Sequence, residues 1–300
     1  VIKELNSEND YIFIQTEDMD QERINMGWGV DISKYSYAVS YAKNEDYCKR
    51  LLMESDIVIF GGANDEDIIK PRLDAGKIVI RYSERIYKEG QWKFISPRGL
   101  IKKYNDHVKY RNSKAYLFCA GGYVASDYSL IKAYPNKKYV WGYFPAIYIY
   151  DDNELNELRT NNKILEIVWS GRMIDWKHPE DVITAVKGLK NAGIDFHLTM
   201  VGAGDLFDHV KEMASKNGIL DYITFTGFVS PKEVRNYMRA ADIYLFTSDF
   251  KEGWGAVLNE SMNSGCAVIA NAAIGAVPYL LKHRENGMVY KNGKKTASFL

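Results

Sequence analysis

ILEIVWSGRMIDWKHPEDVITAVKGLKNAGIDFHLTMV, residues 164–201, contains the pattern that decides the fold class. An apolar run, Ile164–Ser170, is followed by an amphipathic segment, Pro179–Ala192, and then by a second apolar run, Phe196–Val201. A proline opens the amphipathic segment and a glycine follows it, which is typical of a helix between two strands. Because both runs are apolar almost throughout, they predict parallel strands that helices cover on both faces.

Apolar runs and amphipathic segments alternate in the rest of the sequence as well. In the second half we predict further helices at Asp205–Asn217, Pro231–Ala240 and Gly255–Ser264, and further strands at Tyr222–Thr226, Asp242–Thr247 and Ala267–Asn271. In the first half we predict strands at Tyr11–Gln15, Asp56–Phe60, Lys77–Tyr82, Ala115–Cys119 and Lys138–Tyr143, and helices at Asp46–Glu54 and Tyr123–Ala133. Ser230, the proline after it and Glu233 form the pattern of a capping box.

The length of 300 residues suggests two domains, at roughly 100–200 residues per domain. The polar stretch YDDNELNELRTNN at 150–162 predicts a linker with one short helix. We therefore expect domains at 1–155 and 156–300, each an open α/β sheet, facing each other across a cleft. In such sheets ligands bind beyond the carboxyl ends of the strands.

Composition excludes several classes of protein. Lys+Arg and Asp+Glu are 39 each, so the formal net charge is zero, which argues against a broadly basic nucleic-acid-binding protein. No apolar run approaches the roughly 18–20 residues of a membrane span. The three cysteines are widely spaced, which indicates buried thiols in a reducing compartment. The five histidines show no metal-ligand spacing, so we expect no metal site.

Two cations follow the first strand of residues 164–201. The guanidinium of Arg172, after Gly171, can donate hydrogen bonds to two phosphate oxygens at once, and the ammonium of Lys177 supplies a point charge. The pair therefore suits a diphosphate. A solvated basic loop is the alternative. Gly202, directly after the strand Phe196–Val201, suggests either half of a dinucleotide-binding loop or a tight turn. The segment from Gly227 to Val229 suggests either backbone contacts to a nucleotide base or a plain loop.

The segment Glu252-Gly-Trp-Gly-Ala-Val-Leu-Asn-Glu260 is the most informative one. Two glycines flank an aromatic residue between a strand and a helix, where backbone amides and the helix dipole favour an anion. The two carboxylates lie roughly 10 Å apart along the chain, comparable to the span from a sugar to a ribose. Surface glutamates favoured by the helix dipole are the alternative reading.

With these residues, the run from Ile164 to Gly293 resembles the nucleotide-sugar-binding domain of retaining GT-B glycosyltransferases of family four (glycosyl transferases group 1). The matching pieces are SGR with Lys at 170–177, VGAGD at 201–205, FTGFVS at 225–230, ADIYLFTSDFKEGWGAVLNESMNSGCAVIA at 241–270 and ENGMVY at 285–290. RYSERIYKEG at 81–90 and KYVWGYFP at 138–145 look like members that build bacterial capsule or lipopolysaccharide sugars. The chain opens on Val1 and stops at Leu300, and against the family pattern we expect both ends to be truncated.

The resemblance implies a GT-B fold, with two facing Rossmann-like domains, and a metal-independent hexosyltransferase without cofactor. Such an enzyme moves a sugar from a UDP- or GDP-sugar to a glycan or lipid-linked acceptor with retention of configuration. By position, the resemblance gives catalytic roles to Arg172 and Lys177, at the diphosphate, and to Glu252, at the donor sugar. The donor-binding residues that it implies are Gly171, Gly202, Gly227, Phe228, Val229, Gly253, Trp254, Gly255, Ala256 and Glu260, the last at the ribose hydroxyls.

The acceptor site is expected on the first domain, where Glu84 and Arg85 follow a predicted strand. Charges at a strand's carboxyl end face the cleft, and a surface ion pair is the alternative. The resemblance implies a cytoplasmic location, and it leaves peripheral attachment to the inner face of the cell membrane open. Two other functions stay open, a sugar-nucleotide epimerase and a non-catalytic sugar-nucleotide-binding subunit. The spacing of the two cations and the two glutamates favours the transferase.

Overall fold

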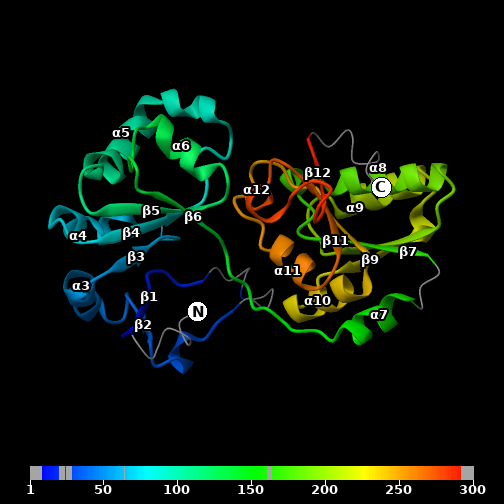
Figure 1. Cartoon of the computed structure of the whole chain (residues 1–300), viewed down its shortest axis with the longest axis horizontal. Coiled ribbons are helices and arrows are strands. Elements are labelled where there is room, and N and C mark those ends of the chain that lie inside the picture. Colours follow the sequence, from blue (N-terminus) through cyan, green and yellow to red (C-terminus); the bar gives the residue numbers. More distant parts are fainter. Residues whose placement is uncertain (1–8, 20–23, 25–28, 64, 161–163, 292–300) are drawn as a thin grey trace. The chain divides into compact units, whose positions relative to one another are not determined.

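A strand occurs at each predicted apolar run in the computed structural model, which describes residues 9–19, 24, 29–63, 65–160 and 164–291 (Figure 1). The chain divides into two compact units. The first comprises Val1–Ser83, Ser96–Phe118 and Tyr128–Tyr139, and the second comprises Glu84–Ile95, Cys119–Asp127 and Val140–Leu300. The predicted functional boundary at 155/156 lies inside a helix of the second unit and stays a prediction.

Strands of the first half of the chain form a four-stranded sheet and a separate pair. The sheet has the order β3 (Val58–Phe60), β4 (Val79–Ser83), β5 (Ala115–Ala120), β6 (Lys138–Trp141), and β1 (Phe13–Gln15) pairs in parallel with β2 (Ala38–Ser40). The helices here are α3 (Glu45–Glu54), α4 (Lys70–Asp74), α5 (Pro97–Asp106) and α6 (Val124–Leu130), with 3₁₀ turns at Ile32–Lys34, Glu66–Ile68, Gln91–Ile95 and Val108–Tyr110. The sequence analysis missed β2, since three half-buried residues are too few to show a strand period.

A buried arginine joins three elements of the first unit. The Arg72 guanidinium, on α4, is 1% exposed and donates to the carbonyls of Leu52, Asp56 and Ile78 at 2.6, 2.9 and 2.9 Å. Leu52 belongs to α3, and the other two carbonyls precede β3 and β4. A single charged side chain therefore connects α4 to the end of α3 and to the segments before β3 and β4.

The second unit contains a six-stranded sheet in which every pairing is parallel. Its order is β12 (Met288–Tyr290), β11 (Ala267–Asn271), β10 (Ile243–Phe246), β7 (Leu165–Ser170), β8 (Phe196–Val201), β9 (Ile223–Gly227). The helices are α7 (Asp152–Thr160), α8 (Pro179–Asn191), α9 (Phe207–Lys216), α10 (Pro231–Ala240), α11 (Val257–Asn263) and α12 (Val277–Leu280), with 3₁₀ turns at Asp175–Lys177 and Leu220–Tyr222. The prediction of an α/β sheet with parallel strands is confirmed.

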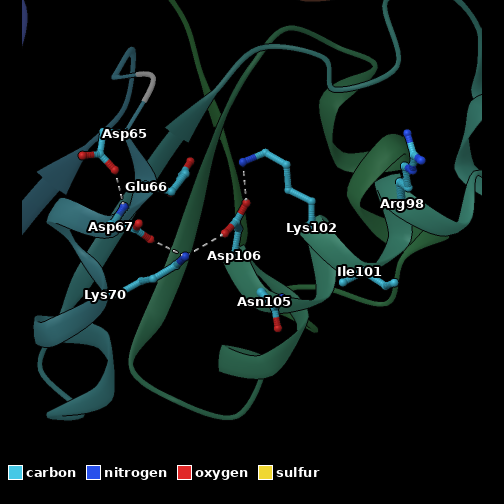
Figure 2. Close-up of a pocket in the computed structure, with 9 residues that line it drawn as sticks. All are labelled: Asp65, Glu66, Asp67, Lys70, Arg98, Ile101, Lys102, Asn105 and Asp106. Carbon is cyan, nitrogen blue, oxygen red and sulfur yellow. Dashed lines mark hydrogen bonds and ion pairs between the residues drawn. The ribbon is translucent and has the colours of Figure 1, made fainter.

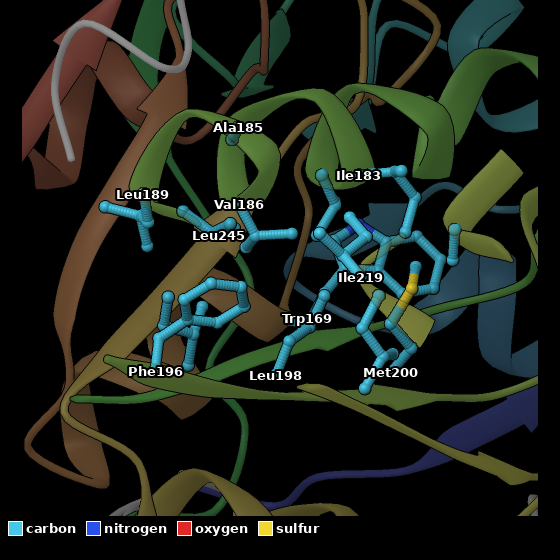
Figure 3. Packing of buried hydrophobic residues seen from close by; sticks show 14 of the residues in the cluster. Trp169, Ile183, Ala185, Val186, Leu189, Phe196, Leu198, Met200, Ile219 and Leu245 are labelled. Atoms are coloured by element: carbon cyan, nitrogen blue, oxygen red, sulfur yellow. The ribbon is translucent and has the colours of Figure 1, made fainter. Parts of the chain in front are cut away.

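Helices cover this sheet on both faces. On one face α8 presents Val182, Ile183, Val186 and Leu189, spaced as one side of a helix, to the strands. Figure 3 shows Ile183, Val186 and Leu189 of α8 packed over Trp169, Phe196 and Leu198. On the other face α10, α11 and α12 contribute Met238, Leu258 and Val277 to a second core cluster. Burying each such aliphatic side chain stabilises the fold by about 1.5–3 kcal/mol.

Two helix starts in the second unit follow from the local sequence. At α10 the Ser230 side chain accepts from the Glu233 amide, and the Glu233 carboxylate accepts from the Ser230 amide, so the predicted capping box is confirmed. The helix predicted from Gly255 begins at Val257 instead. Gly255 has a φ of +89°, which no helical residue adopts, so the helix starts after it.

The short helix predicted in residues 150–162 is confirmed as α7, and one side chain holds it in the second unit. Arg159 donates to the carbonyls of Ser264 and Gly265 at 2.8 Å each, and to that of Arg239 at 3.2 Å. These carbonyls lie just after α11 and near the end of α10, where helices leave acceptors without partners. All three cysteines are buried, as expected. Across the described ranges, no helix has the length and apolar character needed to cross a membrane.

Candidate functional site

Four of the predicted loops follow neighbouring strands of the six-stranded sheet. Gly171 and Arg172 follow β7, Gly202 follows β8, Gly227 ends β9, and Glu252 lies in the loop after β10. Because the strands are parallel, these loops meet at one edge of the sheet. β7 lies between β8 and β10, so the chain switches direction across the sheet at this point. Ligands of open α/β sheets bind at such a switch.

The glycines of the loops after β7, β8 and β9 allow close backbone approach. The amide of Gly171 donates to the carbonyl of Val201 at 3.0 Å, and the amide of Gly202 donates to that of Gly227 at 2.9 Å. A Cβ on Gly202 would overlap the carbonyl oxygen of Gly171, and its φ is +123°. Only glycine fits there, so the residue type at 202 is explained by backbone packing.

The loops after β7 and β10 are joined by a largely buried ion pair. The ammonium of Lys177 contacts the Glu252 carboxylate, and the two side chains are 14% and 12% exposed. The ammonium also lies 4.5 Å from the centre of the Trp176 ring. Backbone contacts reinforce the junction: the Asp249 amide donates to the Trp176 carbonyl at 3.0 Å, and the Thr247 hydroxyl donates to the Lys177 carbonyl at 2.7 Å. Two predicted catalytic residues are therefore in direct contact.

Arg172 differs from Lys177 in its surroundings. Its side chain is exposed, and within the described ranges its guanidinium has neither an ion-pair nor a hydrogen-bond partner. Of the two predicted cations, Lys177 is therefore neutralised by Glu252, and Arg172 is open to a ligand from solvent.

The glycine-rich loop after β10 packs closely on the segment around Gly275. The Gly275 amide donates to the Glu252 carbonyl at 3.2 Å, and a Cβ on Gly275 would overlap the Gly253 carbonyl. The Trp254 indole is 3% exposed and donates to the Asn259 side chain at 2.8 Å. Since the indole is buried, this residue can meet a ligand only through its backbone.

Backbone amides of this loop are available. Within the part of the chain that the structure describes, the amides of Gly253, Trp254 and Gly255 donate to no protein acceptor. Amides without protein partners at a strand-to-helix junction are suited to an anion or to sugar hydroxyls.

Glu260, on α11, is half-buried, with 28% of its side chain exposed. Burial raises the pKa of this carboxyl above its ordinary value of 4.5, and the charge of Arg235 opposes that rise. The Arg235 guanidinium, on α10, lies 3.7 Å from the carboxylate. The sequence analysis missed Arg235. Its position three residues before buried Met238, on the apolar side of an amphipathic helix, is the signal that could have found it.

Phe228 and Val229, the residues predicted to face a base, follow β9 with different exposure. The Phe228 ring is 62% exposed, while Val229 packs against the core cluster that includes Trp254 and Leu258. Ala256 packs against the same cluster. Phe228 is therefore the side chain of this loop that is open to a ligand.

Glu84 and Arg85, the predicted acceptor-side residues, both belong to the second unit. Glu84 accepts from the Tyr143 hydroxyl at 2.6 Å and from the Lys88 ammonium at 2.5 Å. Its carboxylate occupies the place that a side chain at Gly253 would need. The guanidinium of Arg85 lies 3.3 Å from the fully buried Asp127 carboxylate, so Arg85 is engaged in an ion pair.

His178, between Lys177 and the start of α8, is expected to make stability depend on pH. Its ring nitrogens lie 3.3 Å from Glu180 and 3.4 Å from Asp249, and the hydrogen bond with Glu180 raises the pKa of the imidazole above 6.5. A raised folded-state pKa means that the stabilisation is complete below about pH 6.5 and is lost as the pH rises through the raised value.

The test compares the native protein with His178→Asn, since Asn tolerates the left-handed backbone at this position, where φ is +49°. Melting temperatures are measured from about pH 6 to pH 9, and the difference between the two proteins should shrink as the pH rises. A difference that stays constant over this range would contradict the expectation.

A pocket of about 470 Å³ lies on the first unit, and none of the predicted site residues lines it (Figure 2). Its centre is Asp106, which pairs with Lys70 at 3.4 Å and with Lys102 at 3.1 Å. The charged side chains around Asp106 therefore already compensate one another. Among the described residues no group of three or more His, Cys, Asp or Glu side chains could hold a metal ion.

Comparison with known proteins gives a family match in the second half of the chain. The model of the family described as glycosyl transferases group 1 matches residues 151–299. The chain is 28% identical over 142 residues to the GDP-mannose-dependent alpha-(1-6)-phosphatidylinositol monomannoside mannosyltransferase of Mycobacterium tuberculosis, covering 44% of this chain and 37% of that protein. It is 29% identical over 138 residues to the amylovoran biosynthesis glycosyltransferase AmsK of Erwinia amylovora, covering 44% and 34%. The matches span little more than a third of these relatives' lengths.

Solved structures extend the likeness over both halves of the chain. The crystal structure of Anabaena HepE in complex with UDP and glucose matches with a TM-score of 0.65 at 14% identity, covering 96% of this chain and 88% of that one. The apo form of the lipopolysaccharide outer core galactosyltransferase WaaB matches with a TM-score of 0.63 at 18% identity, covering 90% and 75%. These matches show a shared α/β fold with Rossmann-like parallel sheets.

Proposed function

Because the chain belongs, over residues 151–299, to the family of glycosyl transferases group 1, we propose that it is a retaining glycosyltransferase that uses a nucleotide-diphosphate sugar. The donor is a UDP- or GDP-sugar, and the acceptor is a glycan or a lipid-linked glycan. One relative is by name dependent on GDP-mannose, and one neighbour in fold contains UDP and glucose, which supports both nucleotide classes.

The observation that carries the proposal is the meeting of two loops at the switch point of the sheet. There the Lys177–Glu252 ion pair joins the loops after β7 and β10, and the exposed Arg172 lies in the first of these loops. A donor with a diphosphate and a sugar needs both features at one place: cations for the phosphates and a carboxylate for the sugar.

In this proposal Arg172 and Lys177 neutralise the diphosphate. The leaving group of the transfer is a nucleoside diphosphate, and negative charge develops on it as the glycosidic bond breaks. Cations held in place before the reaction stabilise that charge without reorganisation. Lys177 is held by Glu252, so the donor phosphates compete with this carboxylate for the ammonium.

The other proposed contacts lie along the donor, from the sugar through the ribose to the base. Glu252 faces the donor sugar, and the available amides from Gly253 to Gly255 support the sugar or its phosphate. Glu260 accepts from the ribose hydroxyls. The loop from Gly227 to Val229 contacts the base through backbone groups, with the exposed Phe228 ring beside it.

The proposal also covers the acceptor side and the cellular setting. Residues 156–300 bind the donor and residues 1–155 the acceptor, in the GT-B arrangement of the family, with Glu84 and Arg85 on the acceptor side. The reaction takes place in the cytoplasm, at the inner face of the cell membrane, in the synthesis of a surface polysaccharide. The names of the relatives that act in amylovoran synthesis and on a phosphatidylinositol mannoside support this setting.

Nucleotide binding is the first test. Melting temperatures are measured with UDP, GDP, ADP and their sugar esters in a buffer containing a chelator. A ligand at 100 times its Kd adds about 2.7 kcal/mol of stability, which raises the melting temperature by several degrees. Arg172→Ala should weaken the shift, whereas Lys187→Ala, at an exposed cation on α8, should leave it unchanged.

Slow hydrolysis of the donor tests the reaction without knowledge of the acceptor. NMR of the first-formed sugar should show the anomeric configuration of the donor. Inverted product would overturn the retaining mechanism, and a folded protein that no nucleotide stabilises would overturn the donor site as a whole.

A further inference from the structure

Glu260 is a half-buried carboxylate whose oxygens accept no hydrogen bond from the described part of the chain. Burial raises its pKa, so the ionised form needs compensation. Among the described residues Arg235 is its ion-pair partner, at 3.7 Å, and no side chain or backbone amide donates a hydrogen bond to its oxygens. The carboxylate is therefore compensated in charge while both of its oxygens stay available as acceptors.

The hydrogen bonds of Arg235 explain how this is possible. Its Nη1 donates to the side-chain oxygen of Asn263 at 2.8 Å, and its Nη2 donates to the carbonyl of Ala146 at 2.9 Å. The guanidinium lies 4.9 Å from the centre of the Tyr148 ring, and the residue is 8% exposed. These contacts fix the guanidinium beside Glu260 and direct its donors elsewhere.

Asn263 completes the arrangement. Its side chain accepts from the Tyr148 amide at 3.0 Å and donates to the Tyr148 carbonyl at 2.9 Å. The segment from Ala146 to Tyr148 is thereby held against α10 and α11, on which Arg235 and Asn263 lie. Arg235 is thus oriented by neutral acceptors, and its charge is left to act on Glu260.

We propose that Arg235 is a positioning residue for the ribose of the donor, which holds Glu260 ionised while leaving both carboxylate oxygens free for the two ribose hydroxyls. This inference rests on the proposed function, in which Glu260 meets the ribose. A carboxylate accepts two neighbouring hydroxyls at once, and hydrogen bonds to an ionised acceptor are the stronger ones. The preference for ribose over 2′-deoxyribose therefore depends on a residue that never touches the donor.

The experiment measures Kd for UDP and GDP and for their 2′-deoxy analogues, by calorimetry on the full chain. The native protein should bind the ribose form of its own nucleotide about 10–100-fold more tightly than the deoxy form, the range for a hydrogen bond to a charged group. In Arg235→Met the deoxy form should bind no more than about threefold more weakly than the ribose form. Arg235→Lys keeps the positive charge but lacks the planar guanidinium with its several donors, and it should give an intermediate ratio.

Arg239→Met is the matched control. Arg239 lies on the same helix, stacks at 4.8 Å over Tyr150 and pairs with Glu154, but has no contact with Glu260. Its replacement should leave the ratio at the native value. In a Glu260→Gln background, Arg235→Met should produce no further loss of the ratio.

The possible failures are distinguishable. A native protein that binds no nucleotide contradicts the proposed function, and one that binds nucleotide without preferring ribose contradicts the role of Glu260. If the native protein prefers ribose and the Arg235 variants keep the native ratio, Arg235 serves the fold alone and the inference is wrong. A lowered melting temperature without a changed ratio leads to the same conclusion.

Discussion

Glu252→Gln is expected to lower kcat about 10²–10³-fold while leaving the Kd of the donor within about threefold, the loss typical of removing one preorganised electrostatic group. The amide keeps the volume of the side chain, and its oxygen can still accept from Lys177. What is lost is the negative charge, which in the proposed reaction stabilises the positive charge that develops on the sugar ring in the transition state. The measurement is a kcat and a donor Kd for each protein.

Glu212→Gln is the control for this prediction. Glu212 also pairs with a lysine, Lys216, but on an exposed part of α9, with 60% of its side chain accessible. Exposed pairs contribute little, so this variant should keep both the native kcat and the native Kd. A Glu252→Gln protein with native turnover would show that the carboxylate has no part in the transfer.

Gly202→Ala is expected to destabilise the second unit strongly, with a loss of about 3 kcal/mol or more. Two penalties add at this position. A residue with a Cβ at a φ of +123° is strained, and the new methyl group would overlap the Gly171 carbonyl. The new Cβ and the Gly171 carbonyl are both fixed to the backbone, so neither can rotate away. The junction of the loops after β7 and β8 therefore has to open.

Gly193→Ala separates the two penalties. Gly193 also has a positive φ, +70°, but no atom lies within 4 Å of the place where its Cβ would be. Its replacement should cost only the conformational penalty, about 1–2 kcal/mol. Denaturant unfolding of both variants gives the comparison, and equal losses of stability would show that the overlap at Gly202 is relieved without cost.

Local sequence was sufficient to predict most elements of the second unit. The apolar run at Phe196–Val201 has the same bounds in the structure, and the capping box at Ser230 starts a helix where the sequence indicates one. Both signals are carried by adjacent residues. The late start of α11 was missed because the backbone angle of Gly255, on which it depends, cannot be read from residue type alone.

The site itself was predictable in part. Strand ends and glycines placed Arg172, Lys177 and Glu252 at one edge of the sheet, because parallel strands fix where their following loops meet. The partner of each charge depends on tertiary packing, and so the sequence did not indicate that Lys177 contacts Glu252 or that Arg235 compensates Glu260. The roles of these residues in donor binding stay predictions that the experiments above test.

Strand β7 pairs with β8, which comes next along the chain, and also with β10, where Ile243 lies opposite Ile167. Pairings between distant segments are slow to form, because closing the longer chain loop costs more entropy. The Lys177–Glu252 contact depends on the distant pairing, and so we expect it to form after the pairing of β7 with β8. A chain that has paired β7 with β8 and β9 alone lacks this contact. Under the proposed function, nucleotide binding at this edge therefore reports that β10 has also joined the sheet.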